Sequence, residues 1–99
     1  MTMNGTILTD HFQQRIKDRN IPADVVKECL RTGKKYNSKR NIVICNRFIN
    51  CYMSVKDGAG LTIKLSDKLD RRITLDSKRY GTSKREMTRI YFKSIGYTI

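Results

Sequence analysis

The fold is indicated most strongly by residues 41–65, which read NIVICNRFINCYMSVKDGAGLTIKL. Two runs, residues 41–45 and 48–55, are rich in Ile, Val, Phe, Tyr and Cys, which favour strands, and the Asn-Arg pair between them predicts a tight turn. An Asp-Gly pair, which tolerates a positive φ, predicts the next turn. Residues 61–65 then alternate apolar and polar side chains, as a half-buried strand does. The stretch therefore predicts an antiparallel meander.

Two helices are expected ahead of this meander. Residues 5–9 are a short apolar lead-in, interpreted as a small edge strand, and Thr9 or Asp10 can cap a helix over about residues 10–19. Apolar side chains recur four residues apart along it and give one buried stripe, at Leu8, Phe12 and Ile16. Asn20 is the expected stop.

The second helix is bounded by Pro22 and Gly33. Proline suits the first turn of a helix, and glycine suits the left-handed position that terminates one. The polar and strongly basic residues 34–41 that follow are interpreted as a loop or a frayed strand start.

The C-terminal third predicts one more helix. Residues 67–72 are interpreted as a charged connection and residues 73–75 as one more short strand. Ser83 and Glu86 then stand at capping-box spacing ahead of a helical apolar face, and Gly96 ends that helix.

Together these elements predict the α+β class. We expect two N-terminal helices, a three- to four-stranded antiparallel sheet and a C-terminal helix. A chain of 99 residues is long enough for one modest core, so a single basic α+β domain over residues 1–99 is expected.

Charge is the strongest indication of function. The chain holds 21 Lys and Arg against 9 Asp and Glu, a formal net charge of +12. Such a field attracts polyanions, and each phosphate that meets a Lys or Arg releases condensed counterions. RNA or another nucleic acid is therefore the expected partner.

Several function classes are disfavoured. No apolar stretch approaches the roughly 20 residues of a membrane span and no secretion signal is visible, so we expect a cytoplasmic protein without membrane contact. The three cysteines, Cys29, Cys45 and Cys51, are expected to be reduced, and the last two lie in apolar runs that suit small core residues. Since CxxC pairs, paired carboxylates and Gly-rich phosphate loops are missing, neither a metal nor a cofactor is expected.

One constellation suits catalysis. His11, Arg15 and Arg19 recur four residues apart and share one side of the first expected helix. Histidine moves protons near neutral pH, and arginine forks suit phosphate oxygens. RNA cleavage needs an acid and a base, so Tyr36, Tyr52 or a lysine of lowered pKa would have to assist the single histidine. Our catalytic candidates are His11, Arg15 and Tyr36; the alternative is a helical surface whose His and Arg are merely solvated.

Nucleic-acid contacts are expected in the basic regions of the chain. Around Tyr36, a ring among cations can stack on an unpaired base while the charges follow the backbone. The helix N-terminus near residue 83 adds free amides for phosphate. The candidate nucleic-acid-binding residues are Arg19, Lys34, Lys35, Lys39, Arg40, Lys64, Arg71, Arg72, Lys78, Arg79, Lys84, Arg85 and Arg89. Solvated turns and helix faces are the alternative.

Three polar positions on the expected strands depend on which face of the sheet is covered. Thr62, Lys64 and Thr74 would line a cleft if no helix covers their face, and would have no role if that face meets bulk water.

The run HFQQRIKDRNIPADVV, residues 11–26, contains the pattern H-x3-R-I-x2-R and resembles small bacterial toxin domains. The layout over about residues 8–66 is also similar to the colicin-type transfer-RNA nucleases. Both belong with the barnase–EndoU–colicin–RelE group of small, metal-independent ribonucleases. The resemblance implies N-terminal helices followed by an antiparallel sheet whose face forms the cleavage cleft, and it carries over His11, Arg15 and Arg19.

Three functions follow, in order of preference. The first is a metal-independent endoribonuclease of toxin type acting on RNA such as tRNA or mRNA, with an acidic antitoxin or immunity protein as its partner. The second is a non-catalytic nucleic-acid-binding protein of a phage or mobile element. The third is a basic inhibitor that docks an acidic partner protein.

Overall fold

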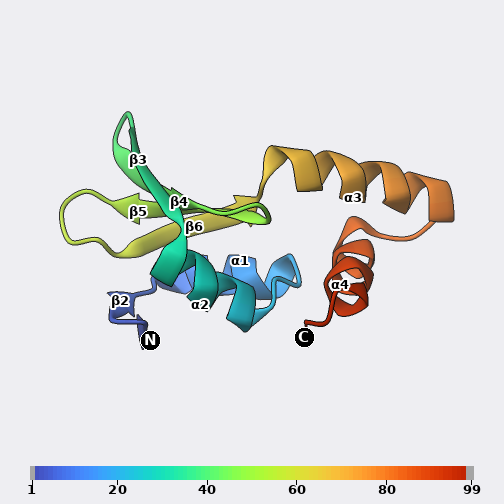
Figure 1. Ribbon diagram of the computed structural model, residues 1–99, viewed down its shortest axis with the longest axis horizontal. Coiled ribbons are helices and arrows are strands. Elements are labelled where there is room, and N and C mark those ends of the chain that lie inside the picture. The colour runs from blue at the N-terminus through green and yellow to red at the C-terminus, as the bar shows by residue number, and fades with distance from the viewer. Residues whose placement is uncertain (1, 98–99) are drawn as a thin grey trace.

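Four antiparallel strands form the central sheet of the computed structural model, which describes residues 2–97 (Figure 1). The elements in chain order are β1 (Thr2–Met3), β2 (Thr6–Ile7), α1 (Asp10–Asp18), α2 (Ala23–Thr32), β3 (Lys34–Ser38), β4 (Asn41–Cys45), β5 (Ile49–Ser54), β6 (Gly60–Leu65), α3 (Asp67–Tyr80) and α4 (Lys84–Ser94). The sheet order β3-β4-β5-β6 follows the chain, so the sheet is a simple meander. A separate ribbon of β1 and β2 precedes it.

The helices α1 and α2 cover one face of the sheet (Figure 1). The first packs beneath β6, and the second packs beneath β4 and β5. Alternation along β5 decides which side chains meet them, because Ile49, Cys51 and Met53 are buried while the residues between them are only partly so. The cross-strand partners of Cys51, which are Ile44 and Ile63, lie on this same face and are buried as well.

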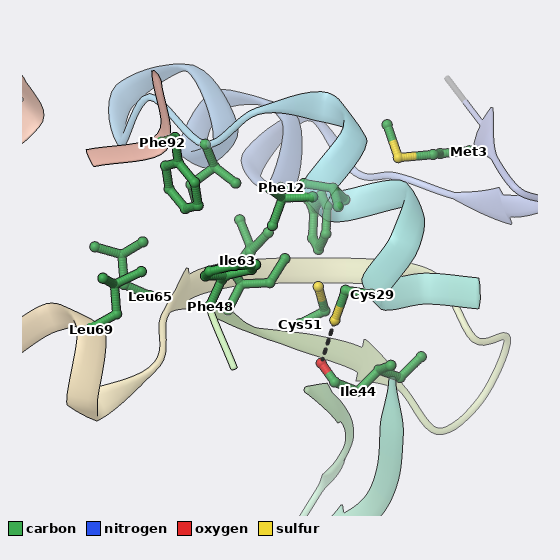
Figure 2. Packing of buried hydrophobic residues seen from close by; sticks show 14 of the residues in the cluster. Met3, Phe12, Cys29, Ile44, Phe48, Cys51, Ile63, Leu65, Leu69 and Phe92 are labelled. Atoms are coloured by element: carbon green, nitrogen blue, oxygen red, sulfur yellow. Dashed lines mark hydrogen bonds between the residues drawn. The ribbon is translucent and has the colours of Figure 1, made fainter. Parts of the chain in front are cut away.

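The core continues from the sheet to the last helix. Figure 2 shows aromatic and aliphatic side chains of α1, the sheet, α3 and α4 gathered in one cluster. The rings of Phe48 and Phe92 meet edge to face with centroids 5.6 Å apart, a geometry that aromatic pairs favour. Cys29 and Cys51 are buried in this cluster as free thiols. A hydrogen bond with Cys29, together with burial, raises the pKa of the Cys51 thiol, which therefore stays protonated.

Several element boundaries agree with the sequence prediction. Thr9 caps α1, its side-chain oxygen accepting a hydrogen bond at 3.2 Å from the amide three residues on. Asn20 has a φ of 51°, the left-handed conformation that stops a helix. Ser83 caps α4 in the same way at 3.1 Å, and Gly96 follows that helix with a φ of 99°.

The prediction for residues 67–75 is wrong. They form neither a connection nor a strand but the first part of α3, a helix of 14 residues. Ser66 caps this helix, and Leu69, Ile73 and Ser77, spaced four residues apart, are its buried stripe. The C-terminal part is therefore a packed pair of helices in place of the single helix expected. None of the helices α1 to α4 is long and apolar enough to cross a bilayer.

The α+β class and the antiparallel meander are confirmed, but the set of strands differs from the expected one. Residues 34–38, interpreted as a loop or a frayed strand start, form β3 and pair along their whole length with β4. This strand lies at the edge of the sheet, where charged side chains are tolerated and hinder pairing with other chains. Its polar sequence therefore fits its position.

Gly33 ends α2 for a reason other than the expected one. Its φ of −67° and ψ of 159° are extended and not left-handed. A Cβ at this position would lie 2.5 Å from the backbone oxygen of Cys29 and 2.8 Å from that of Cys45. Glycine is required because α2 and β4 approach each other closely here. Pro22 also differs from its expected place in the first turn of α2. It is the N-cap residue, because the helix begins at Ala23.

Candidate nucleic-acid interface

The face of the sheet opposite α1 and α2 carries two neighbouring rows of side chains, and we call this surface the open face. The helix α3 leaves the end of β6 and runs away from the sheet, so it does not cover this face (Figure 1). Strand register forms a lysine row, which is Lys34, Cys45, Asn50 and Lys64. It also forms a tyrosine row, which is Tyr36, Val43, Tyr52 and Thr62. The rows are two residues apart along each strand, about 6.6 Å.

The tyrosine row is an aromatic platform. Val43 is 0% exposed although it lies on the open face. Its cross-strand neighbours on this face are Tyr36 and Tyr52. Tyr36 itself is 50% exposed. A half-exposed ring on a paired strand can receive a stacked base with little further ordering.

In the lysine row, Lys64 is held charged beside Tyr52. Its Nζ lies 5.7 Å from the centroid of the Tyr52 ring and 4.0 Å from Oδ1 of Asp67. A hydrogen bond with Tyr52 is the main reason that the pKa of Lys64 is raised, and Asp67 adds to the effect. A lysine with a raised pKa holds phosphate as a cation and does not accept a proton. Lys64 is therefore not the lysine of lowered pKa that RNA cleavage would require.

The helix α1 presents a basic stripe beside the free edge of β6. Arg19 donates a hydrogen bond from Nη1 to the backbone oxygen of Ile63, and Thr9 donates to another carbonyl of the same strand. These bonds satisfy outward carbonyls of an edge strand. Arg19 therefore stabilises the packing of α1 against β6 in addition to contributing a positive charge. His11 is exposed and lies further along the stripe, where its Nε2 accepts a hydrogen bond from Arg15 Nε at 3.4 Å.

A hollow of about 340 Å³ joins this stripe to the lysine row. Arg19 and Lys64 line it together with Lys84 and Arg85, the first two residues of α4. Lys84 forms an ion pair with Asp70 of α3, which fixes the start of α4 at the hollow. Asp18, Asp67 and Asp70 line the hollow as well, so it joins the open face to the α1 stripe through a surface of mixed charge.

The structure separates two of the three catalytic candidates. Tyr36 lies on β3 at one edge of the sheet, whereas His11 lies on α1 beneath β6 at the opposite edge (Figure 1). Three strand spacings, roughly 14 Å, separate the two edges, and the side chains lie on opposite faces. Tyr36 therefore cannot exchange a proton directly with His11. Arg15, in contrast, contacts His11.

The candidates of the β3–β4 hairpin divide between its two faces and its tip. Lys34 belongs to the lysine row, while Lys35 pairs with Ile44 on the opposite face. Lys39 and Arg40 form the exposed turn between the two strands.

The basic candidates of α3 and α4 do not form one surface. Arg71 and Lys78, seven residues apart, share one side of α3, and Arg72 and Arg79 share a second side about 100° around the helix. Two of these charges are paired within their own helix, Arg72 with Asp76 and Arg89 with Glu86. The region is therefore less available to phosphate than its sequence indicates.

Cys45 and Asn50 belong to the lysine row but are not among the sequence-predicted site residues. Only the register of several strands places them there, and no single segment of the sequence indicates it. Thr62 does lie on the uncovered face, whereas Thr74 belongs to α3 and not to a strand.

Within residues 2–97, no three His, Cys, Asp or Glu side chains lie together as a metal site would require. Comparison with protein-family models, with curated proteins and with solved structures gives no match for this chain. The assignment of function therefore depends on the surface described above.

Proposed function

We propose that this protein binds single-stranded RNA across the open face. The tyrosine row carries the proposal, because Tyr36 and Tyr52 flank the buried Val43 on an uncovered sheet. Stacking on an aromatic ring stabilises a bound base by about 1–3 kcal/mol whatever its identity. Bases are free to stack in this way only where they are unpaired, which favours a single strand over a duplex.

The lysine row supports the same proposal. Lys34 and Lys64 stand at its two ends, so a backbone that crosses the platform meets a cation on each side. Asn50 and Thr62 add polar groups that can bond base edges and 2′-hydroxyls. Arg19 and Arg85 add cations in the hollow beyond the edge of the sheet, beside the carboxylates of Asp18, Asp67 and Asp70.

Cys45 offers a direct test, because it lies inside the lysine row. Cys29 and Cys51 are 0% exposed while Cys45 is only half-buried, so iodoacetamide should modify Cys45 first in the folded protein. A short oligouridine at about ten times its Kd should slow this modification about ten-fold, since the bound strand covers the thiol. Mass spectrometry of the intact protein and of its peptides gives the rate at each cysteine.

Two exposed tyrosines provide a matched pair of variants. Tyr36→Ser should weaken the protection of Cys45, whereas Tyr80→Ser, at a position 66% exposed on α3, should leave it unchanged. Modification of Cys45 at the same rate with and without saturating oligouridine would contradict the proposal. Equal effects of the two substitutions would contradict the role of the tyrosine row.

Cleavage of the bound RNA is the second candidate function, and the contact between Arg15 and His11 favours it. An imidazole that transfers a proton beside a guanidinium that holds phosphate supplies two of the groups that metal-independent cleavage to a cyclic phosphate needs, and a second proton-transferring group is required beside them. The resemblance to toxin ribonucleases supports this candidate, and such an enzyme would pair with an acidic antitoxin or immunity protein.

The test is incubation of the protein with total RNA and purified tRNA in the presence of EDTA. Discrete fragments are expected, and His11→Ala should lower the rate of their formation about 100-fold while leaving the protection of Cys45 intact. Gln14→Ala, at an exposed position of the same helix, is the control. Fragments formed at an undiminished rate by His11→Ala would remove the imidazole from the mechanism.

A further inference from the structure

A trough runs along α3 and α4 and consists of two hollows that share Arg72 and Tyr91. One hollow, of about 530 Å³, lies between the two helices, and its apolar lining includes Tyr80, Met87 and Ile90. The other, of about 500 Å³, continues toward the β4–β5 loop, and its apolar lining includes Phe48, Leu69 and Ile95. The trough lies outside the open face and the hollow at Arg19.

Exposed apolar side chains concentrate at this trough. Seven large apolar side chains are exposed within residues 2–97, and four of them, Leu75, Tyr80, Ile90 and Ile95, lie on or directly after α3 and α4. Tyr80, Ile90 and Ile95 line the trough itself. A rimmed apolar surface of this kind on a highly charged chain is typical of a protein-binding site.

The charge of the trough defines its partner. Arg47, Lys68 and Arg72 line the second hollow, and the described part of the chain contributes neither Asp nor Glu to its lining. In the first hollow Asp76 is offset by Arg72, whose Nε lies 3.9 Å from its Oδ2. An apolar surface with a basic rim is complementary to a helix with an apolar stripe and acidic flanks.

The aromatic rings of the trough are occupied in a way that disfavours RNA. The guanidinium carbon of Arg72 lies 5.2 Å from the ring centroid of Tyr91. Arg47 covers Phe48 at 4.7 Å, and Arg79 covers Tyr80 at 5.5 Å. A carboxylate can bond the outward N–H groups of these guanidiniums without moving them, whereas a stacked base needs an exposed ring face such as that of Tyr36 on the open face.

We propose that the trough binds an acidic amphipathic helix of a partner protein. Apolar side chains at positions i, i+3, i+4 and i+7 of that helix would contact Tyr80, Ile90 and Ile95, and its flanking carboxylates would pair with the arginines of the rim. A second copy of this chain is disfavoured as the occupant, since two molecules that each carry a net charge of +12 repel each other.

The experiment uses the full chain and a labelled synthetic helix with leucine at i, i+3, i+4 and i+7 and glutamate at the other outward positions. Fluorescence anisotropy should give measurable binding, and a peptide with the same leucines and lysine in place of glutamate should bind at least about ten-fold more weakly. Ile90→Glu should also weaken binding of the acidic peptide about ten-fold. Val55→Glu is the matched control, because Val55 is 57% exposed and the change of charge is the same.

Several results would overturn the proposal. If Ile90→Glu and Val55→Glu weaken binding of the acidic peptide equally, the loss is due to the change in net charge and not to the trough. If the acidic and basic peptides bind equally well, the arginines of the rim do not contribute to binding. If Tyr36→Ser weakens peptide binding and Tyr80→Ser does not, the peptide occupies the open face. Self-association of the free protein that Ile90→Glu abolishes would make a second copy the occupant.

The proposal stands independently of RNA binding. Ile90→Glu should leave the protection of Cys45 by oligouridine unchanged, because the trough and the lysine row share no residue. A loss of peptide binding with intact RNA protection supports the trough alone, and the reverse result supports the open face alone.

Discussion

Replacement of Gly33 by alanine is expected to lower the free energy of unfolding by about 3 kcal/mol, at the upper end of the range for overpacking. The added Cβ would lie 2.5 Å from the backbone oxygen of Cys29, 2.8 Å from that of Cys45 and 2.9 Å from Cγ2 of Ile44. Two of these three atoms are backbone atoms, so no change of side-chain rotamer relieves the contact. Urea unfolding followed by far-UV circular dichroism measures the loss.

Gly58→Ala separates this steric effect from the general cost of replacing a glycine. Gly58 has a φ of 70°, and within residues 2–97 no heavy atom beyond its own chain neighbours lies within 4 Å of a Cβ built there. Alanine at this position should cost only the strain of the left-handed conformation, about 1 kcal/mol. If Gly33→Ala destabilises the protein no more than Gly58→Ala does, the close approach of α2 and β4 does not constrain the fold.

The same glycine illustrates what local sequence can predict. Its place after an apolar helical pattern correctly marks the end of α2, because that signal is local. The reason for glycine is not local, since the clashing atoms include residues of β4 that lie 11 and 12 positions further along the chain. The sequence therefore predicted the boundary and not its cause.

For the strands, too, local signals in the sequence were sufficient, whereas features that depend on distant contacts were not predicted. Residues 41–45 are β4 as expected, and the two expected strands that follow differ from β5 and β6 by one residue at their ends. Strand-favouring composition in the first two segments and period-two alternation in the third are each visible in a segment alone. The helix α3 was missed because its buried stripe includes Ser77 and is surrounded by charge. Packing of α3 against α4 favours the helix, and that contact is invisible in either segment alone.

The candidate site was less predictable than the fold. Composition alone indicated a polyanion, but it does not show which cations lie on one surface. The pairing of Arg89 with Glu86, or of Lys84 with Asp70, removes charges that the sequence counts as free. The lysine row depends on the register of four strands, which no single motif encodes.

Reversal of both lysines in that row is expected to weaken binding of single-stranded RNA by at least about 70-fold at 50 mM salt. Each phosphate contact to a single strand contributes roughly 0.7 to the slope of log K against log salt. Lys34→Glu with Lys64→Glu removes two such contacts, so the slope should fall by roughly 1.4. Extrapolation from about 1 M to 50 mM salt converts that slope into a loss of roughly 70-fold in affinity, and repulsion between the new carboxylates and the phosphates adds to this loss.

A graded variant guards against damage to the fold, because a glutamate at position 64 would join Asp67 and Asp70 in the same hollow. Lys34→Gln with Lys64→Gln removes the same two contacts without adding repulsion, so affinity should fall by roughly 70-fold. Thermal melts of all variants verify that each is folded.

We expect the position of the substituted lysines, and not the net charge of the protein, to determine the loss of RNA affinity. Lys27→Glu with Lys56→Glu lowers the net charge from +12 by the same four units, but these lysines lie on α2 and in the β5–β6 turn. This control should lose far less affinity, because only the general attraction of the basic chain is reduced. Equal losses would mean that RNA is held by the overall field of the molecule, and the open face would then have no special part in binding.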